Sequence, residues 1–125
     1  MSQLLCVGVG GFLGSIARYL LGSWAQRIAN NHWFPFGTLS VNSLGCLLIG
    51  LLAGYFSTGK LDSENWRLFL ITGVLGGFTT FSAFSFETLY LFRSMHQMGA
   101  LLNILLNVTV SLLAVTAGYC LSKGA

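Results

Sequence analysis

The sequence predicts an all-α integral membrane protein with four transmembrane helices, the third of which is broken. Charged residues make up only 7% of the 125 residues and hydrophobic residues 54%, whereas soluble domains average about 25% charged residues. Four apolar stretches are each long enough to cross a bilayer, and paired glycines and hydroxyls interrupt the third. Residues 1–125 are therefore expected to form a single transmembrane domain.

The first span is expected from about Gln3 to Trp24. It opens without a basic segment and lacks a small-residue cleavage site, so we expect a permanent helix and not a signal peptide. A polar loop from Gln26 to Pro35 follows. The second span is expected from about Gly37 to Phe56.

The third span is predicted from Trp66 to about Phe92, and the fourth from about Gly99 to Leu121. The third exceeds the length of one straight span, which favours two helical halves joined by an unwound link. Because the loops are short, neighbouring helices are expected to be antiparallel. An even number of spans then places both termini on one side of the membrane.

Basic residues are balanced between the two sides. Lys60, Arg67 and Lys123 lie on the side of the termini, and Arg18, Arg27 and Arg93 lie on the other. The positive-inside rule needs an excess on one side to fix orientation. Either an unseen factor sets the orientation, or the chain inserts both ways and pairs with an inverted copy as an antiparallel homodimer. The net charge of +3 is too small and scattered to suggest a nucleic-acid partner.

Small residues recur at four-residue spacing in the first three spans. The pairs are Gly10 and Gly14, Gly50 and Gly54, and Gly73 and Gly77. Such pairs let helix backbones approach closely in lipid. Packing within one chain and a seam between two chains both remain open for them.

Two polar side chains in the first two spans are candidates for function, because buried polar groups in a membrane are expensive. Arg18, near the end of the first span, either extends to the interface or places a fixed positive charge at a vestibule that attracts anions. Asn42 offers amide donors that suit a small ion, or alternatively a bridge between helices.

Aromatic and hydroxyl side chains alternate in the third span. Phe81 and Phe84 are three residues apart, as are Ser82 and Ser85, so rings and hydroxyls form adjacent stripes. Ring edges carry partial positive charge and can solvate an anion weakly, as conduction requires. Ordinary packing is the alternative for these rings.

Further polar residues extend this stripe. Glu87 follows in the third span, where pairing with Arg93 or Arg18 is the simpler interpretation. In the fourth span Asn103, Asn107 and Ser111 step by four and form one polar face, which is expected to contact protein or water and not lipid.

The break is expected around Gly76 and Gly77, with an unwound link from Gly76 to Thr80. Unwinding there would leave backbone carbonyl oxygens without helical partners, and hard cations are bound by such oxygens. A dimer with its two-fold axis near this link would bring two sets of carbonyls together around a small cation.

Three blocks of the chain together resemble the Fluc (CrcB) fluoride channel family. They are GGFLGSIARY in the first span, GTLSVNSLG in the second and GGFTTFSAFSFE in the third. The resemblance implies an antiparallel dual-topology homodimer in the bacterial inner membrane that carries fluoride passively out of the cytoplasm. It implies no enzymatic activity; the expected partners are the fluoride ion, an inverted second copy and the lipid bilayer.

The resemblance also implies residue roles along an anion pathway. Residues of that pathway would be Asn42, the ring pair Phe81 and Phe84, the polar track members Ser82, Ser111 and Glu87, and Arg18 at the end of the first helix. The carbonyl groups of Gly76 and Thr79 would bind a structural sodium ion that is not transported. At Ala83 this chain departs from the usual TFSTFS pattern and lacks one hydroxyl.

Two rival functions differ from a channel in class. A small proton-coupled multidrug-type exporter shares the size and the dual topology, but such exporters resemble one another in a glutamate within the first span, and this span has no acidic residue. A purely structural membrane subunit is disfavoured, because assembly alone does not require so many hydroxyls and glycines in the third span.

Overall fold

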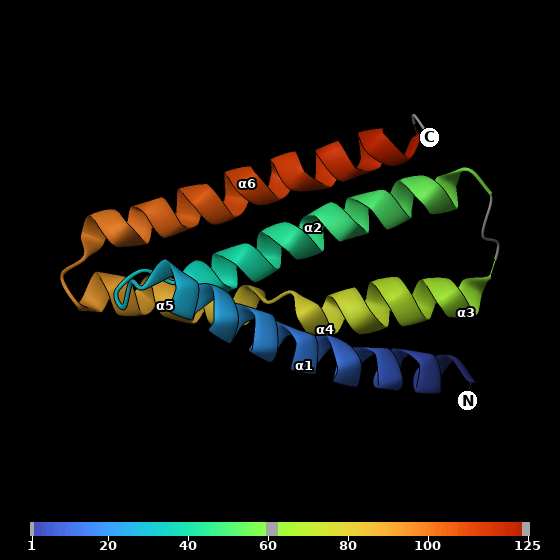
Figure 1. The fold of residues 1–125 in the computed structure, drawn as a ribbon, viewed down its shortest axis with the longest axis horizontal. Helices are drawn as coiled ribbons and strands as arrows, with labels where there is room; N and C mark the ends of the chain where they lie inside the picture. The colour runs from blue at the N-terminus through green and yellow to red at the C-terminus, as the bar shows by residue number, and fades with distance from the viewer. Residues whose placement is uncertain (1, 60–62, 124–125) are drawn as a thin grey trace.

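The protein is described here by a computed structural model that covers residues 2–59 and 63–123, and its secondary structure in these ranges is helical (Figure 1). The helices in chain order are α1 (Ser2–Ala29), α2 (Phe36–Ser57), α3 (Glu64–Arg67), the π-helical η1 (Leu68–Leu75), α4 (Gly76–Phe78), α5 (Phe81–Arg93) and α6 (Gln97–Lys123).

Four stretches are long and apolar enough to cross a membrane: α1, α2, the run Glu64–Arg93 from α3 to α5, and α6. The four expected spans are thus present, and the chain is a multi-pass membrane protein. Both chain ends lie at the same end of the bundle (Figure 1). The first span ends later than expected, since α1 continues to Ala29 and includes Gln26, which we had expected in the loop.

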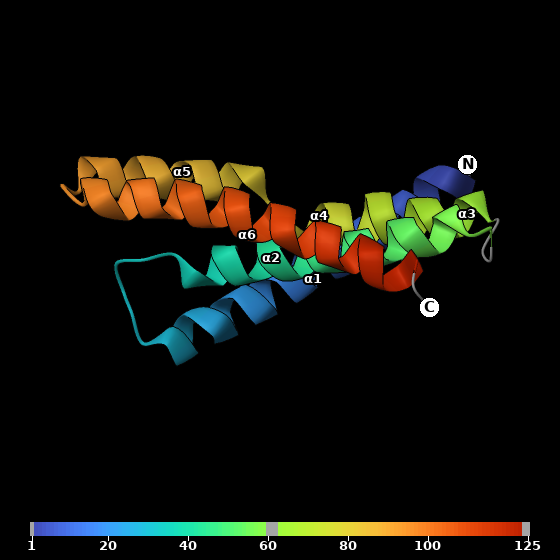
Figure 2. The ribbon, with the colours of Figure 1, turned by 90° about the horizontal axis from the view of Figure 1, so that it is seen from above.

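The third span changes its packing partner along its length. Its first half, η1 and α4, packs mainly against α1, whereas α5 packs against α6. Helices α2 and α6 form the most extensive pairing in the described structure. Figures 1 and 2 show α5 lying beside α6 and α4 lying beside α1.

The interruption of the third span lies at Thr79 and Thr80. Thr79 has φ −84° and ψ 157°, and Thr80 has φ −151° and ψ 120°, so both residues are extended. These two residues lie within the predicted link from Gly76 to Thr80, but the unwinding expected at Gly76 and Gly77 is wrong, because both glycines lie in α4. Two consecutive β-branched residues suit extended backbone better than a helix interior, which explains the shift.

The glycines of the third span instead permit close packing. A Cβ atom built on Gly77 would lie 2.5 Å from the carbonyl oxygen of Gly11 in α1. In the same seam a Cβ on Gly10 would lie 2.9 Å from the Cα of Gly73. Backbones meet here without intervening side chains, as small residues allow in membranes.

A second glycine seam joins α2 to α6. A Cβ on Gly50 would overlap the carbonyl oxygen of Val115, and one on Gly54 would overlap the Ser122 hydroxyl. The glycine pairs that we singled out therefore pack helices within one chain.

Little of the apolar surface is covered by the chain itself. In the most apolar 18-residue segment of each span, only 11 to 22% is buried within the chain. A small apolar cluster centres on Val41, Leu75 and Phe78, while large side chains such as Phe12 and Leu113 are exposed. In a membrane this surface contacts lipid or another protein chain.

We expect Gly14→Ala to destabilise the fold and Gly8→Ala to leave it intact. A Cβ on Gly14 would overlap the Val74 carbonyl oxygen, whereas one on Gly8 meets nothing within 4 Å. Overpacking costs about 1–3 kcal/mol, which exceeds the roughly 1 kcal/mol that alanine gains over glycine in a helix. Thermal unfolding in detergent measures both variants. Equal melting temperatures for the two would show that the α1 seam is not tight.

Candidate functional site

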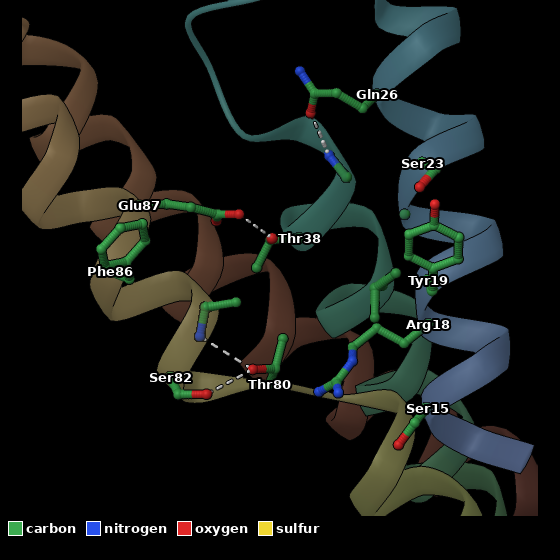
Figure 3. Close-up of a pocket in the computed structure, with 14 residues that line it drawn as sticks. Ser15, Arg18, Tyr19, Ser23, Gln26, Thr38, Thr80, Ser82, Phe86 and Glu87 are labelled. Atoms are coloured by element: carbon green, nitrogen blue, oxygen red, sulfur yellow. Dashed lines mark hydrogen bonds between the residues drawn. The ribbon is translucent and has the colours of Figure 1, made fainter. Parts of the chain in front are cut away.

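Two cavities lie beside the break in the third span. The large cavity, about 760 Å³, is bordered by α1, the start of α2 and α5 (Figure 3). The small cavity, about 290 Å³, lies between α2, the break and α6. Thr80 lines both, so the break separates them.

The seven residues predicted for an anion pathway all line one of these cavities. Those of the small cavity are Asn42, Phe81, Phe84 and Ser111, and those of the large cavity are Arg18, Ser82 and Glu87. Helix α5 therefore borders both spaces: Phe81 and Phe84 line the small cavity, and Ser82 and Phe86 line the large one.

Asn42 pairs with the backbone of the break. Its Oδ1 accepts a hydrogen bond from the Thr80 N–H (2.9 Å), and its Nδ2 donates to the Thr80 carbonyl oxygen (3.1 Å). The same Nδ2 also donates to Asn107 Oδ1 (3.2 Å). An extended residue in a membrane helix lacks helical partners for its backbone, and one amide supplies both here.

The hydroxyl of Thr80 begins the next helix. Thr80 Oγ1 accepts a hydrogen bond from the Ala83 N–H (3.1 Å), an N-cap that satisfies one of the free amides at the start of α5. The Ser82 hydroxyl lies 3.1 Å from the same oxygen (Figure 3). Ala83, which has no side-chain hydroxyl, thus contributes its backbone N–H to this corner of the large cavity.

Arg18 reaches the break from α1. Its Nη1 donates to the Thr79 carbonyl oxygen at 3.4 Å, and its side chain points into the large cavity (Figure 3). The residue lies well before the end of α1 at Ala29, so the first helix does not place it at a terminus as the sequence suggested. The guanidinium supplies a fixed positive charge to the large cavity.

Glu87 borders the large cavity from α5 and is held by α2. The Thr38 hydroxyl donates to Glu87 Oε1 (2.7 Å), while Oε2 is buried without a hydrogen-bond partner (Figure 3). The pairing with Arg18 or Arg93 considered from the sequence does not occur in the described structure. Thr38 was not singled out from the sequence, although it lies one helical turn before Asn42 and so shares its face.

The ring pair has one buried and one exposed member. The centroids of Phe81 and Phe84 are 5.3 Å apart and the rings are tilted by 53°. Phe84 is 8% exposed, whereas Phe81 is 78% exposed and projects beyond the chain. The hydroxyl of Ser85 donates to the Phe81 carbonyl oxygen within the same helix, and Ser85 lines neither cavity.

The polar face predicted on α6 is divided as well. Asn107 and Ser111 line the small cavity, whereas Asn103 is 0% exposed and lies behind Asn107. Asn107 Nδ2 donates to Asn103 Oδ1 (2.9 Å). The stepping by four thus brings the two asparagines together on one face.

Gln26 shapes the rim of the large cavity, and its role was missed. Its Nε2 donates to the carbonyl oxygens of Asn31 and Phe34, and its Oε1 accepts from the Gly37 N–H (Figure 3). One side chain of α1 therefore ties down the loop that leads into α2. No local pattern in the sequence indicates such a contact, because its partners are backbone groups.

The chain is similar to known membrane proteins over nearly its whole length. The family model described as CrcB-like protein, Camphor Resistance (CrcB) matches residues 5–119. A Rhizobium meliloti (strain 1021) protein named Fluoride-specific ion channel FluC is 47% identical over 98% of both chains. Proteins of the same name from Elusimicrobium minutum and Clostridium perfringens (strain 13 / Type A) are each 44% identical. The Elusimicrobium protein aligns with 98% of this chain over 95% of its own length. The Clostridium protein aligns with 95% of this chain over 92% of its own length.

These similarities cover the segments that build both cavities, and the family match spans all four membrane helices. On this evidence the chain belongs to the CrcB-like protein family.

Proposed function

We propose that this protein is a fluoride-selective ion channel that exports fluoride passively from the cytoplasm and so lowers intracellular fluoride. The observation that carries the proposal is the convergence of Asn42, Phe81, Phe84 and Ser111 on one small cavity beside the helix break. The names of the relatives support fluoride as the ion. A location in the bacterial inner membrane accords with the four spans.

The two cavities suggest a path with two stages. Arg18 gives the large cavity a positive charge that attracts anions, and the hydroxyls of Thr80 and Ser82 replace part of the ion's hydration shell. Beyond the break, ring edges and the Ser111 hydroxyl complete the replacement. Their individual contacts with an anion are weak, so the ion is not trapped.

An inverted second copy would complete this path. Phe81 is 78% exposed although it lines the small cavity, so one side of that cavity is formed by no other part of the described chain. The balanced basic residues allow insertion in both orientations. We propose that an antiparallel homodimer covers Phe81 and the exposed apolar surface beside it.

A structural sodium ion fits the carbonyl groups at the break. The Thr80 N–H donates to Asn42 and not to the carbonyl of Gly76, which it would meet in a continuous helix. Gly76 is exposed on the surface of the chain, where a partner copy could approach it. The Thr79 carbonyl oxygen already accepts from Arg18 at 3.4 Å, a long contact that leaves a lone pair for the ion. We propose that Gly76 and Thr79 of two copies together bind sodium, which holds the dimer and is not transported.

Liposomes that contain the purified protein should release trapped fluoride, measured with a fluoride electrode, while trapped chloride stays inside. The expected basis is the set of ring edges and polar donors in the small cavity, which would replace the hydration shell of the smaller ion. Empty liposomes are the control. Folded, inserted protein that releases no more fluoride than they do would overturn the proposal.

We expect Phe81→Ile to lower fluoride flux by about two- to tenfold, equivalent to the roughly 0.5–1.5 kcal/mol that one aromatic contact contributes. Size-exclusion chromatography should still show a dimer. Phe12→Ile, on the exposed surface of α1, is the matched control and should conduct normally. Unchanged flux in Phe81→Ile would mean that this ring serves packing only.

Replacing sodium by N-methylglucamine, with the anion kept constant, should lower the melting temperature of the dimer in detergent. A ligand that binds only the assembled state stabilises it, and its removal reverses this. This experiment measures the thermal stability of the dimer and does not depend on conduction. Identical melting curves in the two cations would argue against the sodium site.

A further inference from the structure

A chain of buried side chains connects the two walls of the small cavity. It runs from Asn42 on α2 through Asn107 and Asn103 on α6 to Thr88 on α5. We call these four residues the amide relay. Only Asn42 and Asn107 line the cavity; Asn103 and Thr88 lie behind it.

The hydrogen bonds of the relay have a defined direction. Asn42 Nδ2 donates to Asn107 Oδ1 (3.2 Å). Asn107 Nδ2 in turn donates to Asn103 Oδ1 (2.9 Å) and to the Asn103 carbonyl oxygen (3.1 Å). Asn103 Nδ2 donates to Thr88 Oγ1 (2.9 Å).

The far end of the relay is the backbone of a cavity residue. The Thr88 hydroxyl donates to the Phe84 carbonyl oxygen (2.7 Å) while it accepts from Asn103. The relay therefore joins the amide on one wall of the small cavity to the turn of α5 that carries the ring on the other wall.

Burial makes this direction difficult to reverse. Asn103 is 0% exposed, Asn107 6% and Thr88 9%. If the Asn107 amide were flipped, its NH₂ group would face the NH₂ group of Asn42, and two buried donors would lack acceptors. Asn103 and Thr88 do not line the cavity, so water in it does not replace their hydrogen bonds, and the relay favours a single orientation.

We infer that Thr88, Asn103 and Asn107 are positioning residues for the anion path, which orient the amide of Asn42 relative to Phe84. Asn42 then holds Thr80 with one amide edge, while its second N–H points along the cavity wall toward Asn107. This inference rests on the proposed function for its effect on conduction, but the geometry that it describes is independent of the ion.

Thr88→Val tests the relay from outside the cavities, because valine matches the shape of threonine and removes only the hydroxyl. We expect fluoride flux to fall by about three- to tenfold, the equivalent of one buried hydrogen bond. Thr88→Ser should restore the flux. Thr109→Val is the matched control, since the Thr109 hydroxyl bonds only to Leu105 within α6 and is exposed. A normal flux in Thr88→Val would overturn the inference.

A double-mutant cycle separates positioning from general packing. If Thr88 acts through Asn42, Thr88→Val should add no further loss in an Asn42→Ala background. Full additivity of the two losses would show that Thr88 does not act through Asn42 and would overturn the inference.

An NMR experiment tests the relay without a measurement of conduction. The chain has six asparagines, so ¹⁵N-asparagine labelling gives six side-chain amide signals, and Asn42→Ala or Asn42→Ser identifies that of Asn42. Thr88→Val should shift the Asn42 signal, although the two residues do not touch; an unmoved signal refutes the relay. If Thr88→Val shifts the Asn42 signal but the wild-type protein releases no fluoride, only the proposed function is refuted.

Discussion

The pairing of the Asn42 amide with both backbone groups of Thr80 is the interaction on which the rest of the site depends. A helix that breaks inside hydrocarbon leaves N–H and C=O groups unpaired, and each costs several kcal/mol. One asparagine from a neighbouring helix satisfies the pair. Without it the third span would either become continuous or admit water, and the two cavities would merge or close.

Because the break is stabilised, the two halves of the third span can pack against different helices. Glycine-mediated contact fixes the first half against α1, whereas packing against α6 and a hydrogen bond from Asn103 to Thr88 fix α5. The charged side chains of Arg18 and Glu87 border one cavity, while Asn42, Phe81 and Phe84 border the other. The chemical contrast between the cavities thus follows from where the helix is interrupted.

Much of this architecture could be predicted from the sequence, because span length and apolar composition are local properties. The polar and aromatic residues that line the two cavities could also be singled out from the sequence, since such groups are conspicuous in apolar helices. The break lies at the end of the link predicted from Gly76 to Thr80. Its extent was overestimated, because Gly77 serves packing against α1, which no local pattern distinguishes from unwinding. Contacts of Gln26, Thr38 and Thr88 depend on which helix faces them, and that is known only once the fold is assembled.

The two extended residues at the break also limit how the chain can change in length. An α-helix turns by about 100° per residue, so one residue inserted beside Thr80 would rotate α5 by that angle relative to α4. The two halves pack against different helices, so neither half can rotate to compensate for the insertion. Phe84 would turn away from Asn42, and Thr88 away from Asn103. The loop from Asn30 to Pro35 is held by Gln26 as well, but a change in its length would not rotate one half of a membrane span against the other.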